Sequence, residues 1–179
     1  MLINTDTVIK VLQVVAWIIF IGLSIETGAL LFNFIYSLFN PVVTKNLYFG
    51  LNLSELFAQH KFIYACVASF LVLISALKAY VFYLVIRVFM TLNLVKPFSL
   101  EVATIIERIS YSVFRVGLLG LLAHQFFRGL TRKGIPVDTT VDLYWDEWGT
   151  FLMMAAILLV ITHIFKKGMD LQVENDLTV

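Results

Sequence analysis

Residues 11–39, VLQVVAWIIFIGLSIETGALLFNFIYSLF, decide the class of the fold. The stretch is overwhelmingly apolar, and its one charged residue, Glu26, lies near its middle. A helix of about 20 apolar residues is long enough to span a bilayer. A charge inside such a helix costs about 2.5–3.5 kcal/mol on insertion scales. We therefore expect the other helices to provide Glu26 with a partner.

The composition of the whole chain points to the same class. The 179 residues are 60% hydrophobic and only 14% charged, whereas soluble domains are about 25% charged. The net charge of +1 leaves no basic face, which argues against direct nucleic-acid binding. The single cysteine, Cys66, excludes an internal disulfide and a cysteine-based metal site. We expect one domain that contacts the lipid bilayer.

Apolar runs separated by polar segments predict an all-α integral membrane protein, a four-helix bundle with long first, second and third helices. The first span ends before Asn40-Pro41, because the residue before proline disfavours helix. Ser99 is a natural N-cap for the third helix, and Glu101 in its first turn suits the helix dipole. The predicted segments are spans at about 8–39, 62–90, 105–127 and 149–165, and a polar C-terminal tail at 168–179.

Lysines and arginines indicate the orientation of the predicted spans, because they favour the cytoplasmic side. Four spans place both termini on one side, and that side has slightly more basic residues than the other. The side of the termini carries Lys10, Arg87, Lys96, Arg108, Lys166 and Lys167, and the other side carries Lys45, Lys61, Arg128, Arg132 and Lys133. We expect both termini to be cytoplasmic.

Glu26, Lys78 and Arg115 each fall near the midpoint of a long helix. Helices that cross the bilayer with matching centres would hold the three charges at one depth, joined by an intramembrane salt bridge. Three interpretations remain open: a structural triad that fixes helix packing, snorkelling of Lys78 or Arg115 to an interface, and a ligand, proton or ion site.

Other polar residues give weaker signals. His124 and Arg128 are i, i+4 neighbours near the end of the third helix, and we interpret them as polar neighbours of a site. The three histidines include no i, i+4 pair and no HExxH motif, so we expect no dedicated metal site. Three carboxylates at i, i+4 spacing follow the third span (Asp138, Asp142 and Asp146). A divalent cation could bind them, but a solvated surface is the favoured interpretation.

Two glycines in the third span, Gly117 and Gly120, are three residues apart and do not form a GxxxG motif. Small residues at such positions allow two membrane helices to approach closely. We favour a packing role for these glycines over a hinge.

Two segments carry a family resemblance: residues 96–101, KPFSLE, and residues 168–179, GMDLQVENDLTV. Together with four spans in fewer than 200 residues, they resemble a bacterial family of four-span membrane proteins of unknown function. Its members have an Asn-Pro-Phe or similar segment after the second span, where this chain has Lys96, and a tail ending in Leu-Thr-Val or Leu-Thr-Ile. The resemblance implies a bacterial cytoplasmic membrane, a partner among small helix-turn-helix regulators, and no established catalytic residues.

The leading hypothesis is a non-enzymatic small membrane protein that senses or binds something at the bilayer and signals to a cytoplasmic helix-turn-helix regulator. The partner-binding tail would comprise Glu174, Asp176, Leu177, Thr178 and Val179, because domains of the PDZ type capture such C-terminal ends. An ordered cap and a frayed end are the alternative interpretations of this segment. The alternative is a subunit of a transporter or channel, oligomeric if it forms a pore, with the Glu/Lys/Arg set lining the path. No catalytic or cofactor motif supports an enzyme acting on lipids.

Overall fold

The computed structural model describes residues 5–92 and 99–177, and the regular elements in this part of the chain are all helical. The predicted all-α class is therefore confirmed. The elements in chain order are α1 (Thr5–Phe39), the 3₁₀ helices η1 (Pro41–Lys45) and η2 (Tyr48–Gly50), α2 (Ser54–Gln59), α3 (Lys61–Thr91), α4 (Leu100–Arg132), the 3₁₀ helix η3 (Thr139–Tyr144), and α5 (Trp148–Leu177).

Capping residues mark the end of α1 and the start of α4, at the positions that the sequence predicts. Asn40 follows the last residue of α1, and its side chain accepts a hydrogen bond from the Val42 N–H at 3.3 Å, which opens η1. Ser99 precedes α4, and its hydroxyl accepts a hydrogen bond from the Val102 N–H at 3.3 Å. These caps satisfy N–H groups that have no partner within the helix.

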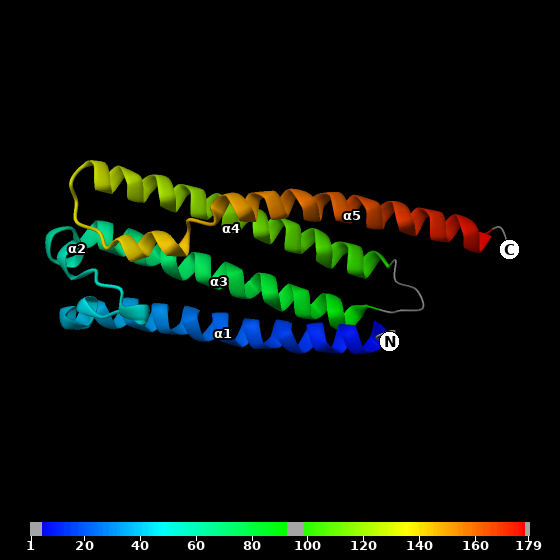
Figure 1. Cartoon of the computed structure of the whole chain (residues 1–179), viewed down its shortest axis with the longest axis horizontal. Coiled ribbons are helices and arrows are strands. Elements are labelled where there is room, and N and C mark those ends of the chain that lie inside the picture. Colours follow the sequence, from blue (N-terminus) through cyan, green and yellow to red (C-terminus); the bar gives the residue numbers. More distant parts are fainter. Residues whose placement is uncertain (1–4, 93–98, 178–179) are drawn as a thin grey trace.

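The four long helices lie side by side in the order α1, α3, α4, α5 (Figure 1), and each packs on the next. The two outer helices, α1 and α5, do not pack extensively on each other in the described part of the chain. The bundle packing is thus open along one seam. The start of α1 and the end of α5 lie at the same end of the arrangement (Figure 1), as the sequence predicts.

Helices α4 and α5 approach each other closely at two glycines. A Cβ atom at Gly117 would lie 2.8 Å from the Leu152 side chain and 3.0 Å from the Leu152 backbone nitrogen, and one at Gly120 would lie 3.0 Å from the Trp148 Cβ. The Ser110 hydroxyl donates a hydrogen bond to a backbone carbonyl of α5 at 3.0 Å. The expected packing role of the two glycines is confirmed.

Three segments of the described chain are long and apolar enough to cross a membrane: Thr7–Phe39, Lys61–Thr91 and Thr139–Gln172. The expectation of four spans is thus met for three of them. The remaining predicted span, 105–127, lies in α4 and contains Arg115, His124 and Gln125. These polar residues lower its hydropathy, so length and composition alone do not identify α4 as a span.

Helix α5 is longer than the predicted span at 149–165. It continues through Lys166 and Lys167 to Leu177, so the described part of the expected polar tail, from residue 168 onward, is helical. Figure 1 shows this end of α5 reaching beyond the ends of its neighbours. Charged residues end an apolar run but do not end a helix, and the segment contains no proline to break it.

A buried pair of hydroxyl groups joins α1 to α3 near the loop end of the bundle, which is the end with η1, η2 and α2, opposite the two termini (Figure 1). The side chains of Ser37 and Tyr64 are both fully buried and are joined by a hydrogen bond. The Ser37 hydroxyl also donates to the Phe34 carbonyl at 2.7 Å, so the Tyr64 hydroxyl is the donor to Ser37. Tyr64 packs edge-to-face on Phe57 of α2.

The Ser37–Tyr64 pair predicts an unequal effect of removing its two members. Ser37→Ala leaves the Tyr64 hydroxyl buried without its acceptor, so we expect a loss of about 1–3 kcal/mol in the free energy of unfolding. Tyr64→Phe removes the donor and leaves Ser37 bonded to Phe34, so we expect a loss of only about 0.5–1.5 kcal/mol. Denaturant unfolding in detergent measures both. Equal losses, or a larger loss for Tyr64→Phe, would contradict the assignment of Tyr64 as donor.

Candidate functional site

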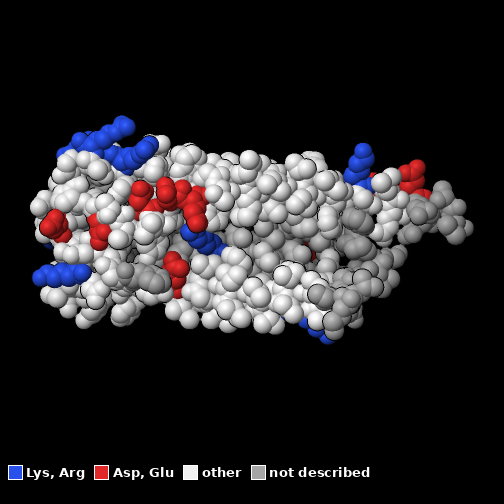
Figure 2. Space-filling view, viewed as in Figure 1, with Lys and Arg blue, Asp and Glu red and all other residues white. Residues whose placement is uncertain are grey.

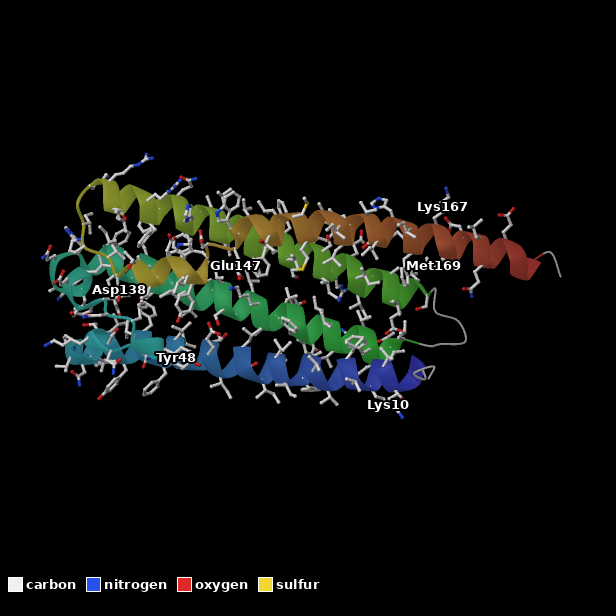
Figure 3. All side chains as sticks on the ribbon, viewed as in Figure 1. Lys10, Tyr48, Asp138, Glu147, Lys167 and Met169 are labelled. Atoms are coloured by element: carbon white, nitrogen blue, oxygen red, sulfur yellow. The ribbon has the colours of Figure 1, made fainter. Side chains whose placement is uncertain are left out.

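The segment between α4 and α5, residues 133–147, runs back along the helices and is called the fold-back segment below. Gly134, whose φ of +71° favours glycine, starts the return of the chain after α4. Figure 3 shows Asp138 near the loop end of the arrangement and Glu147 further along the helices, just before α5. This course brings η3 beside α1 and α3, where its residues form one wall of a cavity with Glu26 and Lys78.

The cavity between α1, α3 and η3 has a volume of about 410 Å³ and mixed polar and apolar walls. Its lining residues are Glu26, Leu51, Lys78, Thr140, Leu143 and Tyr144. Figure 2 shows acidic and basic side chains gathered near one end of a hollow on the visible face. Two of the three charges expected at one depth, Glu26 and Lys78, thus line the same space.

Lys78 is held by groups other than Glu26. Its Nζ donates a hydrogen bond to the Tyr144 carbonyl at 3.4 Å and lies 5.3 Å from the centre of the Phe151 ring, in a cation–π contact. Within residues 5–92 and 99–177, no ion pair shorter than 4.0 Å joins Lys78 to Glu26. The expected intramembrane salt bridge is therefore absent from the described chain, although both charges line the same cavity.

Tyr144 is a third lining residue of the cavity with a polar side chain. Its hydroxyl oxygen is buried and has no hydrogen-bond partner among the described residues. A buried hydroxyl without a partner costs about 1–3 kcal/mol. A polar group that reached this hydroxyl would reduce the cost.

An apolar cleft of about 530 Å³ adjoins the polar cavity. All four long helices contribute to it, and it extends along α3 from Lys78 to Phe89. Apart from Lys78 and Glu147 its lining is apolar, namely Ile19, Leu23, Val81, Phe82, Val85, Val88, Phe89, Ile106, Ile109, Val113, Phe151, Met154, Leu158 and Ile161. Lys78 lines both the polar cavity and the apolar cleft, so the two spaces meet at its side chain.

Arg115 does not belong to this site. Its side chain is exposed, and it lines neither the polar cavity nor the apolar cleft. The buried face of α4 passes through Val113, Val116 and Gly117, and Arg115 is about 100° away from Val116 around the helix. The expected charge cluster is therefore reduced to Glu26 and Lys78.

His124 and Arg128 are not brought together as polar neighbours. The His124 ring is half-buried, and its Nδ1 lies 3.1 Å from an Asp142 oxygen in η3. Arg128 is exposed and has no hydrogen bond or ion pair with His124 in the described chain. The Asp142 oxygen also accepts a hydrogen bond from the Trp145 indole at 2.9 Å, so His124 helps to fasten the fold-back segment to α4.

The predicted tail site is only partly within the described residues. Glu174 is exposed on the last turn of α5, which ends at Leu177, and Asp176 lies in the same turn. Thr178 and Val179 lie outside the described residues, as does the 96–98 part of the segment that carries the family resemblance.

Sequence reasoning missed several site residues. The sequence does not single out Tyr144, it places Phe151 only within a predicted span, and it gives Asp142 as one member of a solvated acidic run. Each reaches its contacts because residues 133–147 fold back, and no local pattern predicts that course. The interruption of helix at Gly134 and Pro136 ahead of an amphipathic stretch was the one available signal.

Asp138 joins the fold-back segment to the loop between η2 and α2, which contains Asn52. Its carboxylate accepts hydrogen bonds from the Asn52 N–H at 3.0 Å, the Thr140 N–H at 3.0 Å and the Thr140 hydroxyl at 2.8 Å. Partial burial acts to raise the pKa of Asp138, but these hydrogen bonds outweigh it and hold the pKa below its ordinary value. The ionised form is therefore favoured in the folded protein.

The lowered pKa of Asp138 predicts acid sensitivity. Its contribution to stability is present above the ordinary aspartate pKa, about 3.9, and is lost as the pH falls through the lower folded-state pKa. We expect the wild type to lose more thermal stability than Asp138→Asn between about pH 5 and pH 2. Differential scanning fluorimetry across this range measures the difference. Parallel pH profiles for the two proteins would rule out the role assigned to Asp138.

Comparisons with known proteins do not place the chain in a group. No protein-family model, no curated protein sequence and no solved structure matches it.

Proposed function

We propose that this chain is a non-enzymatic integral membrane protein that binds a membrane amphiphile in the seam between α1 and α5. The main support for this proposal is that Lys78 lines both the polar cavity and the apolar cleft. A polar headgroup would occupy the cavity with Glu26, Lys78 and Tyr144, and an acyl chain would lie in the cleft. Ligand sites of this kind combine apolar walls with a few placed polar groups.

The open seam supports access from the bilayer. Because α1 and α5 do not pack extensively on each other, the cleft opens sideways, and a lipid chain could enter without crossing a packed interface. Glu26 and Lys78 favour a headgroup with both a cationic and an anionic group, since each charge would then find an opposite charge. A zwitterionic lipid with a single chain meets both requirements.

Helix α5 offers a route from this site to a partner. Its residues Phe151, Met154 and Leu158 line the cleft, and the same helix continues to Leu177 beyond its neighbours. We propose that binding is relayed to a cytoplasmic helix-turn-helix regulator, as the family resemblance implies, with both termini cytoplasmic. Pull-down with the full chain and with residues 174–179 deleted tests this relay, because capture of identical proteins would remove the role of the tail.

A transporter or channel subunit is the second candidate, because Glu26 and Lys78 line a cavity with polar walls within membrane-type helices. The exposed position of Arg115 removes one of the three charges expected along such a path. Glu26→Gln tests this candidate in vesicles: an unchanged ion or proton flux, where the wild type shows flux, would contradict it.

The binding proposal is tested with lysophosphatidylethanolamine, a zwitterionic single-chain lipid, on the full chain in mild detergent. Native mass spectrometry compares the wild type with Lys78→Met and with Arg115→Met, a matched control that removes a mid-helix cation outside the site. We expect Lys78→Met to reduce lipid retention at least about tenfold, equivalent to 1.4 kcal/mol, and Arg115→Met to leave it unchanged. Equal retention by all three proteins would overturn the proposal.

A further inference from the structure

A second cluster of ligating side chains lies at the junction of α4, η3 and α5, where it involves none of the residues that line the amphiphile site. One nitrogen of His124 and one carboxylate oxygen each of Asp142 and Asp146 all lie within 4.8 Å of one another. Helix α4 supplies the histidine, and the fold-back segment supplies both carboxylates. The three residues converge only because the chain returns along α4.

The spacing of these atoms suits a shared metal ion. Zinc binds histidine nitrogen and carboxylate oxygen at about 2.0–2.2 Å, which places two ligand atoms of a tetrahedral site roughly 3.3–3.5 Å apart. The His124 nitrogen and the Asp142 oxygen lie 3.1 Å apart. Asp146 is exposed, so its carboxylate can close the remaining distance by changing rotamer. Three protein ligands and one water would then complete a tetrahedron.

Neighbouring groups hold two of the ligands in place. The Trp145 indole N–H donates to the Asp142 oxygen at 2.9 Å, and the His124 ring lies beside the Trp148 ring with centroids 6.5 Å apart. Hydrogen bonds of this outer kind orient metal ligands and raise affinity. No lysine or arginine forms an ion pair with Asp142 or Asp146 among the residues that the structure describes, so the negative charge at the cluster is not offset by a basic residue.

We propose that His124, Asp142 and Asp146 form a binding site for a divalent transition-metal ion of the zinc class. Imidazole favours zinc and its neighbours, whereas magnesium and calcium favour sites built from oxygen alone. A bound ion would join α4 to η3. The same η3 supplies Thr140 and Tyr144 to the headgroup cavity, so metal binding would also stiffen that wall.

Zinc titration of the full chain tests the site, after removal of any affinity tag and treatment with a chelator. Isothermal titration calorimetry compares the wild type with His124→Ala and Asp146→Asn. The controls are His163→Ala and Asp170→Asn, which remove an exposed histidine and an exposed carboxylate of α5. We expect one zinc ion per chain in the wild type and both controls, and affinity at least about tenfold weaker in the two cluster variants.

Three results would overturn the metal site: no zinc uptake by the wild type, wild-type affinity in Asp146→Asn, or magnesium binding as tight as zinc binding. Asp146→Asn keeps the test decisive even where His124→Ala fails to fold. The Asp146 side chain is exposed and makes no hydrogen bond or ion pair that the described structure shows, so its substitution leaves the fold-back segment intact. The readout is metal binding alone, so it is independent of whether the protein binds an amphiphile.

Discussion

Replacing Gly117 by alanine is expected to lower the free energy of unfolding by about 1–3 kcal/mol, as for overpacking at a closely packed site. The added Cβ would lie 2.8 Å from Leu152 side-chain atoms and 3.0 Å from its backbone nitrogen. A side chain can rotate away from such a contact, but a helix backbone cannot move without displacing its neighbours. Helices α4 and α5 would have to separate, with loss of packing along their interface.

Gly129→Ala is the matched control, because Gly129 lies in the same helix and a Cβ there would meet no atom within 4 Å. Alanine stabilises a helix interior by roughly 0.5–1 kcal/mol relative to glycine, and this gain is common to both variants. The difference between them therefore isolates the cost of the contact with α5. Denaturant unfolding in detergent measures it, and equal stability of the two variants would show that the helices are not closely packed at Gly117.

The long helices could be predicted from the sequence because their signals are local. A run of apolar residues sets the length of a span, Pro41 sets the end of α1, and Ser99 sets the start of α4. Each of these signals acts within one turn of helix. The end of α5 was missed because the change from apolar to charged residues after Phe165 marks a change of solvent and not a change of backbone conformation.

The candidate site could be predicted only in part. The position of a residue along a membrane helix gives the depth of its charge in the bilayer, but not the direction in which the side chain points around the helix axis. A shift of one residue changes that direction by about 100°. Glu26 and Lys78 therefore meet at one cavity, whereas Arg115 faces outward. The contact of His124 with Asp142 joins residues 18 apart through a fold-back, and no sequence periodicity predicts it.

Replacing Trp145 by alanine is expected to cost about 3–5 kcal/mol of stability, the range for removing a large buried side chain. Trp145 is 3% exposed. Its ring packs against Phe127 with centroids 6.1 Å apart, and its N–H donates to Asp142 at 2.9 Å. The substitution removes the largest side chain that fastens the fold-back segment to the core, so we expect residues 133–147 to become accessible to protease.

Trp17→Ala provides the matched control, because Trp17 is 42% exposed on α1 and lines neither the polar cavity nor the apolar cleft. We expect it to change stability by no more than about 0.5 kcal/mol, as for other surface substitutions. Trp145→Phe separates packing from hydrogen bonding, since it keeps an aromatic ring and removes the N–H. We expect its cost to lie between those of the two alanine variants, and thermal unfolding in detergent measures all three.

The Trp145 result also decides whether the fold-back segment is a structural unit or a loose loop. If the segment were a loose loop, Trp145→Ala would lower the stability of the protein only slightly. That outcome would contradict the assignment of η3 as a fixed wall of the polar cavity. A large loss would mean that the segment is fastened from inside, through Trp145 and the His124–Asp142 contact together. The exposed position of Asp146 on this segment would then be fixed relative to α4, which is the condition that any ion shared with His124 requires.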